Sequence, residues 1–395
     1  MPRAHPRGRL IRHATPRVAA EAAEQTVNPE RAGDVRGSAL HRIRFSTEAQ
    51  LAVAVLVIIV AFASFYPRQF ASITNAQNIA RQGAVLLVVA VGQMFTLVVG
   101  GFDISVGANM GLASTVGALV MIDYGLLPGM LAGLLASTTV GLINGVLISR
   151  FRVSPFVATL GMLTFITGLA NQLSGGASVS GLPPGFSLFG GTDWGPVPST
   201  VGIAAVVMLL VWVLLSRTRI GLYVYSIGGS RETCVLAGVP VPRYEVFAYT
   251  ACGFLAGVGG LMLMSRVRVG QAALGQGFEL LSIATAVIGG VAIGGGQGRL
   301  LGVLLGVALL SVFRTGMNIA GLSEFIQLML IGLVLILAVL IDRLRAAGRR
   351  VFRGSIRAWR EGMHPGPSVG RASAEGSEID PHPQAPAKLP ESRGD

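Results

Sequence analysis

Long apolar runs separated by short polar stretches fill the chain between residues 50 and 341. Many of these runs approach the roughly 20 residues that a helix needs to cross the hydrocarbon core of a bilayer. The pattern therefore predicts an all-α polytopic membrane protein with about ten transmembrane helices. The predicted spans are 50–66, 80–100, 104–122, 127–148, 156–173, 199–215, 245–265, 279–294, 300–318 and 325–341.

The composition agrees with a membrane-embedded body. The chain is 52% hydrophobic and has 54 glycines, which allow helix backbones to approach closely in lipid. A net charge of +12 is also typical of nucleic-acid binding. However, most basic residues lie in the tails and in loops on one predicted side, as the positive-inside rule requires. We therefore expect the lipid bilayer, and no nucleic acid, as the partner of this charge.

The arginines also orient the predicted spans. Arg150 and Arg152 follow the fourth span, Arg299 follows the eighth, and further arginines follow the last. An even number of spans with these loops inside places both termini in the cytoplasm. Arg266 and Arg268 break the rule, because they fall outside. We interpret residues 1–48 and 343–395 as disordered cytoplasmic tails that flank a permease domain at 49–342.

One polar interruption separates two hydrophobic blocks. It covers residues 217–244, RTRIGLYVYSIGGSRETCVLAGVPVPRY, and carries Arg217, Arg219, Arg231 and Arg243. Its positive charge predicts a cytoplasmic location. A segment of this size in the cytoplasm is typically presented to a soluble partner, so we interpret it as the part that receives force from that partner.

Enzymatic chemistry is not expected in this chain. Its single lysine, Lys388, lies in the second tail, so no GxxxxGK[ST] nucleotide loop is present. The five histidines also lie in the tails, and no zinc-ligand spacing is present, so we expect no metal site. We therefore predict no cofactor in this chain, and ATP, if it drives the protein, would be bound by a partner subunit.

Several polar residues fall within or beside the spans and are candidates for a substrate pathway. Asp103 and Glu279 each precede an apolar run, where a helix cap is the competing interpretation. Neutral amide and hydroxyl groups suit a hydroxylated ligand, although each one alone is more often an interhelical hydrogen bond. The candidates are Asp103, Asn109, Thr159, Thr164, Asn171, Gln172, Glu279, Ser282 and Thr285.

Four stretches resemble the permease subunit of ribose-type ABC importers. They are GGFDISVGA at 100–108, SPFVATLGML at 154–163, GLYVYSIGGSRETCVLAGVPV at 221–241, and the block from Gly275 to Asp342. The resemblance implies a type II-like importer in the bacterial plasma membrane. It also implies a permease homodimer, a cytoplasmic ABC ATPase subunit and an extracytoplasmic sugar-binding protein.

The same resemblance makes 226–241 the ATPase coupling loop, with Gly228, Gly229 and Gly238 at the glycine positions of the family. Arg231, Glu232, Thr233 and Cys234 stand where relatives usually have a small-residue pair, and this departure bears on the identity of the ATPase.

The expected function is import of a monosaccharide, a ribose- or xylose-like sugar or a polyol, by alternating access. An ABC permease for nucleosides or branched-chain amino acids is one alternative. Another is an ion-coupled secondary transporter, which needs an ion-binding carboxylate near the midplane. Only Asp103 and Glu279 are close to that position.

Overall fold

The computed structural model describes residues 47–333, 336–337 and 340. The chain separates into two units, Met1–Ala338 and Val339–Asp395, and the account below concerns the first. The predicted disordered tails lie outside the described residues, except that Thr47 and Glu48 begin the first described helix.

The described part of the chain is almost entirely helical, which confirms the predicted all-α class. The helices long and apolar enough to cross a membrane are α2 (Thr47–Phe65), α4 (Ile73–Val98), α5 (Val106–Tyr124), α6 (Leu126–Ser149), α7 (Pro155–Ser174), α8 (Ser199–Arg217), α11 (Val241–Val267) and α13 (Leu300–Ile319). The shorter helices are α3 (Pro67–Phe70), the 3₁₀ helix η3 (Pro184–Phe189), α9 (Arg219–Gly229), α10 (Arg231–Leu236), α12 (Phe278–Ile288) and Glu324–Leu333. A small hairpin pairs β1 (Asp193–Trp194) antiparallel to β2 (Val197–Pro198).

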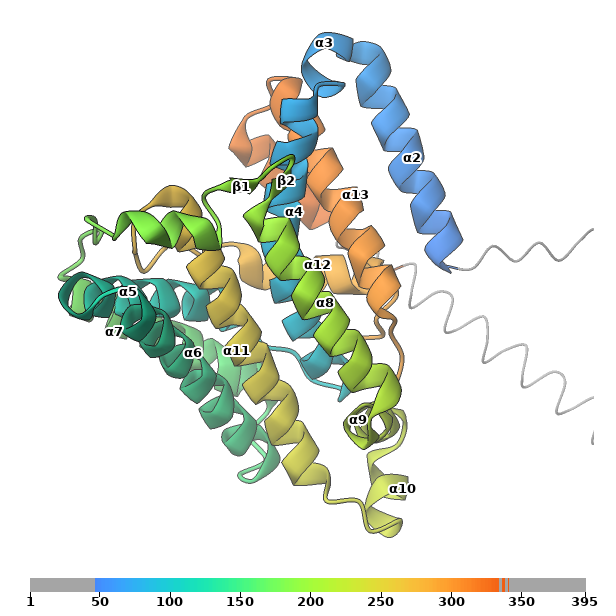
Figure 1. Ribbon diagram of the computed structural model, residues 1–395. Coiled ribbons are helices and arrows are strands. Elements are labelled where there is room, and N and C mark those ends of the chain that lie inside the picture. Colours follow the sequence, from blue (N-terminus) through green and yellow to red (C-terminus); the bar gives the residue numbers. More distant parts are fainter. Residues whose placement is uncertain (1–46, 334–335, 338–339, 341–395) are drawn as a thin grey trace, which may run out of the picture. The chain divides into compact units, whose positions relative to one another are not determined.

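Helix α4 forms the centre of this bundle. Every residue from Gly83 to Val98 is buried, and α8, α11, α12 and α13 all contact the helix (Figure 1). A helix that is apolar on all sides is expected in an interior. The apolar run predicted at 80–100 therefore forms the centre of the bundle.

Glycine contacts bring α11 and α6 unusually close. A Cβ on Gly141 would lie 2.4 Å from the carbonyl oxygen of Tyr249, and one on Gly253 would lie 2.6 Å from that of Ser137. Small residues permit such contacts where no hydrophobic force holds helices together in lipid. Part of the high glycine content is explained by this interface.

The predicted span at 279–294 is shorter than expected. Helix α12 has 11 residues, well below the roughly 20 that cross a bilayer. Gly277, with φ +88°, precedes it, and the Gly289-Gly290 pair ends it, with Gly290 at φ +86°. The apolar pattern continues past both glycines, but the left-handed backbone that they adopt does not continue a helix.

The predicted external connection at 174–198 is folded onto the end of α11. Phe186 is fully buried, and Val179 and Gly270 exchange backbone hydrogen bonds. The Arg268 guanidinium donates to the carbonyl oxygens of Leu182 and Pro183. This contact explains why Arg268 lies at a predicted external position, since it holds the connection in place.

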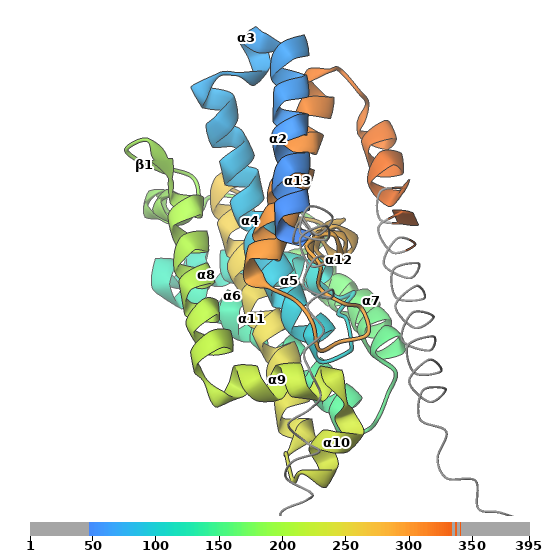
Figure 2. The ribbon, with the colours of Figure 1, turned by 90° about the vertical axis from the view of Figure 1, so that its right-hand side faces the viewer.

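Helices α3 and α10 mark opposite ends of the bundle (Figure 2). Arg152 lines the same small cavity as Arg231 near α10. Arg299 also lies near this end, because its neighbour Gly298 accepts a hydrogen bond from Tyr225 of α9. The structure thus gathers loop arginines that are far apart in the sequence at the α10 end.

Candidate functional site

The predicted pathway residues divide into a buried group and an exposed group. The buried residues are Asp103, Asn109, Thr159, Ser282 and Thr285. Asn109 donates to the Ser137 carbonyl of α6 at 3.0 Å, whereas Thr159 and Ser282 donate to carbonyls of their own helices. These five side chains are buried among the described residues of one chain.

The exposed group follows one face of α7. Thr164, Asn171 and Gln172 are all exposed, and no described atom lies within 4 Å of a Cβ placed on Gly161 or Gly168. Spacings of three, four and seven residues put these five positions on one side of a helix. We call this surface the α7 wall. It offers amide and hydroxyl groups on a helix that is long enough to cross the membrane.

A broken span lies beside α7. Residues 270–277 run as irregular backbone before α12 begins at Phe278. Ala272 of this segment packs with Ile166 and Ala170 of α7. Irregular backbone at membrane depth is tolerated where protein buries it or where it lines an aqueous cavity. We call residues 270–288 the broken span.

Glycines of α5 seat the broken span against the bundle. A Cβ on Gly111 would lie 2.0 Å from the Ala272 carbonyl oxygen, and one on Gly107 would lie 2.0 Å from Glu279 Oε2. The half-buried Glu279 carboxylate accepts from the Gly277 backbone N–H at 3.0 and 3.1 Å. Glu279 therefore caps the start of α12, where a carboxylate also suits the helix dipole. The exposed Gln276 next to this turn was not predicted from the sequence.

Gly111→Ala is expected to disrupt the packing of the broken span against α5. The added methyl group meets a backbone carbonyl that cannot rotate away, and overpacking of this kind costs typically about 1–3 kcal/mol. The purified protein should therefore lose thermal stability relative to the unmodified chain. Gly161→Ala on the α7 wall is the matched control, because the space there is open. Equal melting temperatures for the two variants would contradict this packing.

Asp103 is not the N-cap residue itself. The N-cap of α5 is Ser105, and Asp103 lies two residues before it with 1% of its surface exposed. Its carboxylate accepts from the Ser105 backbone N–H at 2.8 Å and from the Ser105 hydroxyl. The carboxylate thus stabilises the turn that leads into α5, rather than the first turn of the helix.

The predicted coupling loop consists of two short helices at the α10 end. Thr218 caps α9, and Ser230 caps α10 by accepting from the Thr233 N–H. Arg231 forms an ion pair with Glu245 at the start of α11, and this hydrogen bond raises the pKa of Arg231 above its ordinary value. The pair fastens α10 to one of the long helices of the bundle.

The tip of α10 carries an apolar side chain that the sequence analysis did not single out. Leu236 is 89% exposed, and the neighbouring Val235 is 54% exposed. Glu232 is exposed on the same helix, whereas Gly238 follows at φ +76° in open space among the described atoms. A leucine in such a position suits a partner surface better than water.

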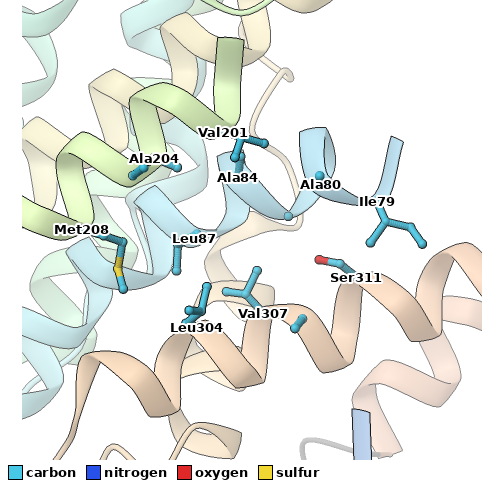
Figure 3. Close-up of a pocket in the computed structure, with 13 residues that line it drawn as sticks. Ile79, Ala80, Ala84, Leu87, Val201, Ala204, Met208, Leu304, Val307 and Ser311 are labelled. Carbon is cyan, nitrogen blue, oxygen red and sulfur yellow. The ribbon is translucent and has the colours of Figure 1, made fainter. Parts of the chain in front are cut away.

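An apolar cavity among the described residues does not suit a sugar. It has a volume of about 500 Å³ and lies between α4, α8 and α13, where aliphatic side chains line it almost completely (Figure 3). Ser311 is the one hydroxyl among its labelled residues. A sugar needs several hydrogen-bond partners, because its buried polar groups are costly when unpaired. The α7 wall and the broken span are therefore better candidates for the pathway.

A comparison with known protein families covers the α7 wall and the broken span. Residues 75–339 match the family described as branched-chain amino acid transport system / permease component. The ribose import permease protein RbsC of Escherichia coli (strain K12) is 33% identical over 76% of this chain and 96% of its own length. The RbsC protein of Bacillus subtilis (strain 168) is 37% identical over 75% of this chain and 92% of its own length.

The D-allose transport system permease protein AlsC of Escherichia coli (strain K12) is 32% identical over 73% of this chain and 90% of its own length. No solved structure matches the chain. These matches confirm the resemblance to ribose-type permeases, whose members are transport components rather than enzymes. The chain belongs to the family of multi-pass permease components of binding-protein-dependent transport systems.

Proposed function

We propose that this chain is the permease subunit of an ATP-driven ABC importer that moves a monosaccharide into the cytoplasm by alternating access. The observation that carries the proposal is the match to ribose and allose permeases along nearly their whole length. The family match over residues 75–339 also includes the α7 wall, the broken span and the coupling segment. The sugar is delivered outside by a binding protein, and closure of the ATPase supplies the differential affinity that shifts the conformational equilibrium.

The pathway in this proposal follows the α7 wall and the broken span. Thr164, Asn171 and Gln276 present uncharged hydrogen-bonding groups on the outer surface of one chain. Polar groups at membrane depth normally face protein or water rather than lipid. A second copy of the chain placed across this surface would enclose an aqueous passage, so we propose that the transporter contains a permease homodimer.

The α10 end faces the cytoplasm in this proposal, in the bacterial inner membrane. Arg152, Arg231 and Arg299 lie toward that end, and arginines near span ends resist translocation. Both termini are then cytoplasmic. The chain has no lysine for a nucleotide loop except Lys388, so ATP is bound by a separate subunit that docks on α10. We therefore propose no cofactor for this chain itself.

ATP-driven uptake by the reconstituted complex tests the function. Proteoliposomes would contain the permease, its ATPase and its binding protein, and radiolabelled ribose, allose and arabinose would be offered. We expect uptake of one sugar that requires ATP. Uptake of a nucleoside alone, or of leucine alone, would favour the alternative cargo, and the family description names branched-chain amino acids. Uptake driven by a proton gradient without the ATPase would overturn the proposal.

Cysteine labelling tests the pathway. Cys234 and Cys252 are both buried and would be replaced by serine before Asn171→Cys is introduced. We expect a membrane-impermeant thiol reagent to label this cysteine in the complex and excess sugar to slow the labelling, because the side chain lines an aqueous passage. Ser282→Cys, at a buried position, should remain unlabelled. An unreactive Asn171→Cys in the working complex would contradict the assignment of the α7 wall.

A further inference from the structure

The turn between α4 and α5 is held on one side by buried polar side chains from three helices. It covers residues 99–105 and contains Asp103, which is 1% exposed. The Gln93 side chain of α4 is oriented with its amide nitrogen toward the backbone carbonyl of Asp103. In this orientation it donates to that carbonyl at 3.1 Å and accepts from the Asp103 backbone N–H at 2.9 Å. Asn144 of α6 donates to the Ser105 hydroxyl at 2.9 Å and, more weakly, to Asp103 Oδ2 at 3.4 Å. We call Gln93, Asp103, Ser105 and Asn144 the polar knot.

Helix α11 completes this side of the turn. The Tyr249 hydroxyl donates to the Phe102 carbonyl at 3.5 Å, and a Cβ on Gly101 would lie 2.2 Å from the same hydroxyl oxygen. Tyr249 is 1% exposed. The turn thus touches α4, α6 and α11, and buried hydrogen bonds hold its conformation in addition to apolar packing of Val99 and Phe102.

On its other side, the turn and the end of α4 meet the coupling segment at a close approach of backbone atoms. A Cβ on Gly295 would lie 2.9 Å from Gly228 Cα and 3.0 Å from Gly100 Cα. A Cβ on Gly228 would lie 1.8 Å from the Val98 carbonyl oxygen, which accepts from the Gly296 N–H at 2.8 Å. Three chain segments therefore meet without side chains between them. We call this contact the glycine junction.

A junction without side chains transmits displacement well. Where two segments meet through flexible side chains, changes of rotamer can absorb a small shift, whereas close-packed backbone passes the shift on. Movement of α9 at Gly228 must therefore move the end of α4 or open the contact. Beyond the turn, α5 begins at Val106, and its Gly107 rests against the Glu279 carboxylate of the broken span. A continuous route joins the coupling segment to the pathway.

We propose that Asp103 is a positioning residue for transport: the polar knot keeps the α4–α5 turn rigid, so that movement of α9 reaches α5 and the broken span. This inference rests on the proposed function of the chain. Asp103 touches no sugar in this role. Its carboxylate is suited to the task because it accepts hydrogen bonds from both groups of Ser105 and from Asn144, whereas an amide has one acceptor oxygen.

The test exchanges the side chains of Asp103 and Asn144 and measures sugar uptake and ATP hydrolysis by the reconstituted complex. Asp103→Asn should lower sugar uptake by about tenfold while ATP hydrolysis by the complex stays within about twofold of the unmodified value, because the coupling is weakened rather than the assembly. The double variant Asp103→Asn with Asn144→Asp retains one carboxylate and one amide at the same contact. It should recover most of the sugar transported per ATP.

The unmodified complex is measured first, and its failure to take up sugar with ATP would overturn the proposed function before any variant is compared. With an active complex, three results would overturn the role of Asp103. They are normal uptake by Asp103→Asn, no recovery in the exchanged pair, or a fall in ATP hydrolysis and uptake in equal proportion. If Asp103→Asn does not assemble, Ser105→Ala provides the same comparison with one hydroxyl removed. Its sugar-to-ATP ratio should fall, and an unchanged ratio would also overturn the role.

Discussion

Replacing Gly228 by valine is expected to abolish ATP-driven uptake. The new Cβ would lie 1.8 Å from the Val98 carbonyl oxygen and 2.3 Å from the Gly296 nitrogen, and both are backbone atoms. Overpacking in cores costs typically about 1–3 kcal/mol, and more where the neighbours cannot shift. The α9 helix must therefore move away from the turn, which opens the glycine junction between the coupling segment and the end of α4.

Gly229→Ala is the matched control for this variant. It lies next to Gly228 in the same helix, but no described atom is within 4 Å of its Cβ position. Uptake assays and membrane-inserted protein levels would be measured for both variants. Gly229→Ala should transport like the unmodified protein. Transport by Gly228→Val at the unmodified rate would mean that α9 is not seated at the glycine junction in the working complex.

Replacing Leu236 by aspartate is expected to separate the permease from its ATPase. A large apolar side chain that is 89% exposed at the tip of α10 fits the anchor of an interface, and loss of such an anchor commonly costs about 2 kcal/mol or more. The affinity should therefore fall by at least about thirtyfold, at roughly 1.4 kcal/mol for each factor of ten. Copurification of the ATPase with the detergent-solubilised permease measures the effect.

Leu188→Asp controls for the chemistry of the substitution. Leu188 is 59% exposed in η3, within the connection that the proposal places outside the cell. This variant should retain the ATPase fully. Equal retention by both variants would show that α10 does not carry the docking surface. Loss of the ATPase from both would indicate a general effect of the added charge.

Particular residues show how far the sequence predicts the fold. The apolar runs identified the long helices, because each is a continuous stretch of lipid-compatible side chains. The predicted span at 325–341 is described only as the shorter helix Glu324–Leu333 and at residues 336, 337 and 340, and the rest of it lies outside the described residues. The other exception is the broken span. Its apolar composition matches a full helix, but Gly277 and Gly290 adopt left-handed backbone conformations that hydropathy does not register. The positions of Gly277 and Gly290 in the sequence were the available indication that this helix is interrupted.

The candidate site was less predictable for a physical reason. Polar residues within a span have the same composition whether they face a neighbouring helix or a passage. Thr159 and Thr164 are five residues apart on α7, yet the first is buried and the second is exposed. Packing against other helices decides between them, and this information is not local. Leu236 was missed because it stands in the short apolar stretch CVLAGV, where a leucine is usually buried by packing.

The position of α2 has a consequence for biosynthesis. Among the described helices, α2 packs mainly against α13 and has no buried residue, and a Cβ on Gly316 of α13 would lie 2.3 Å from the Phe62 ring of α2. The ribosome makes α2 first among these helices and α13 near the end. The nascent α2 must therefore wait in lipid until the late helix emerges. Assembly of this permease cannot proceed strictly in the order of translation.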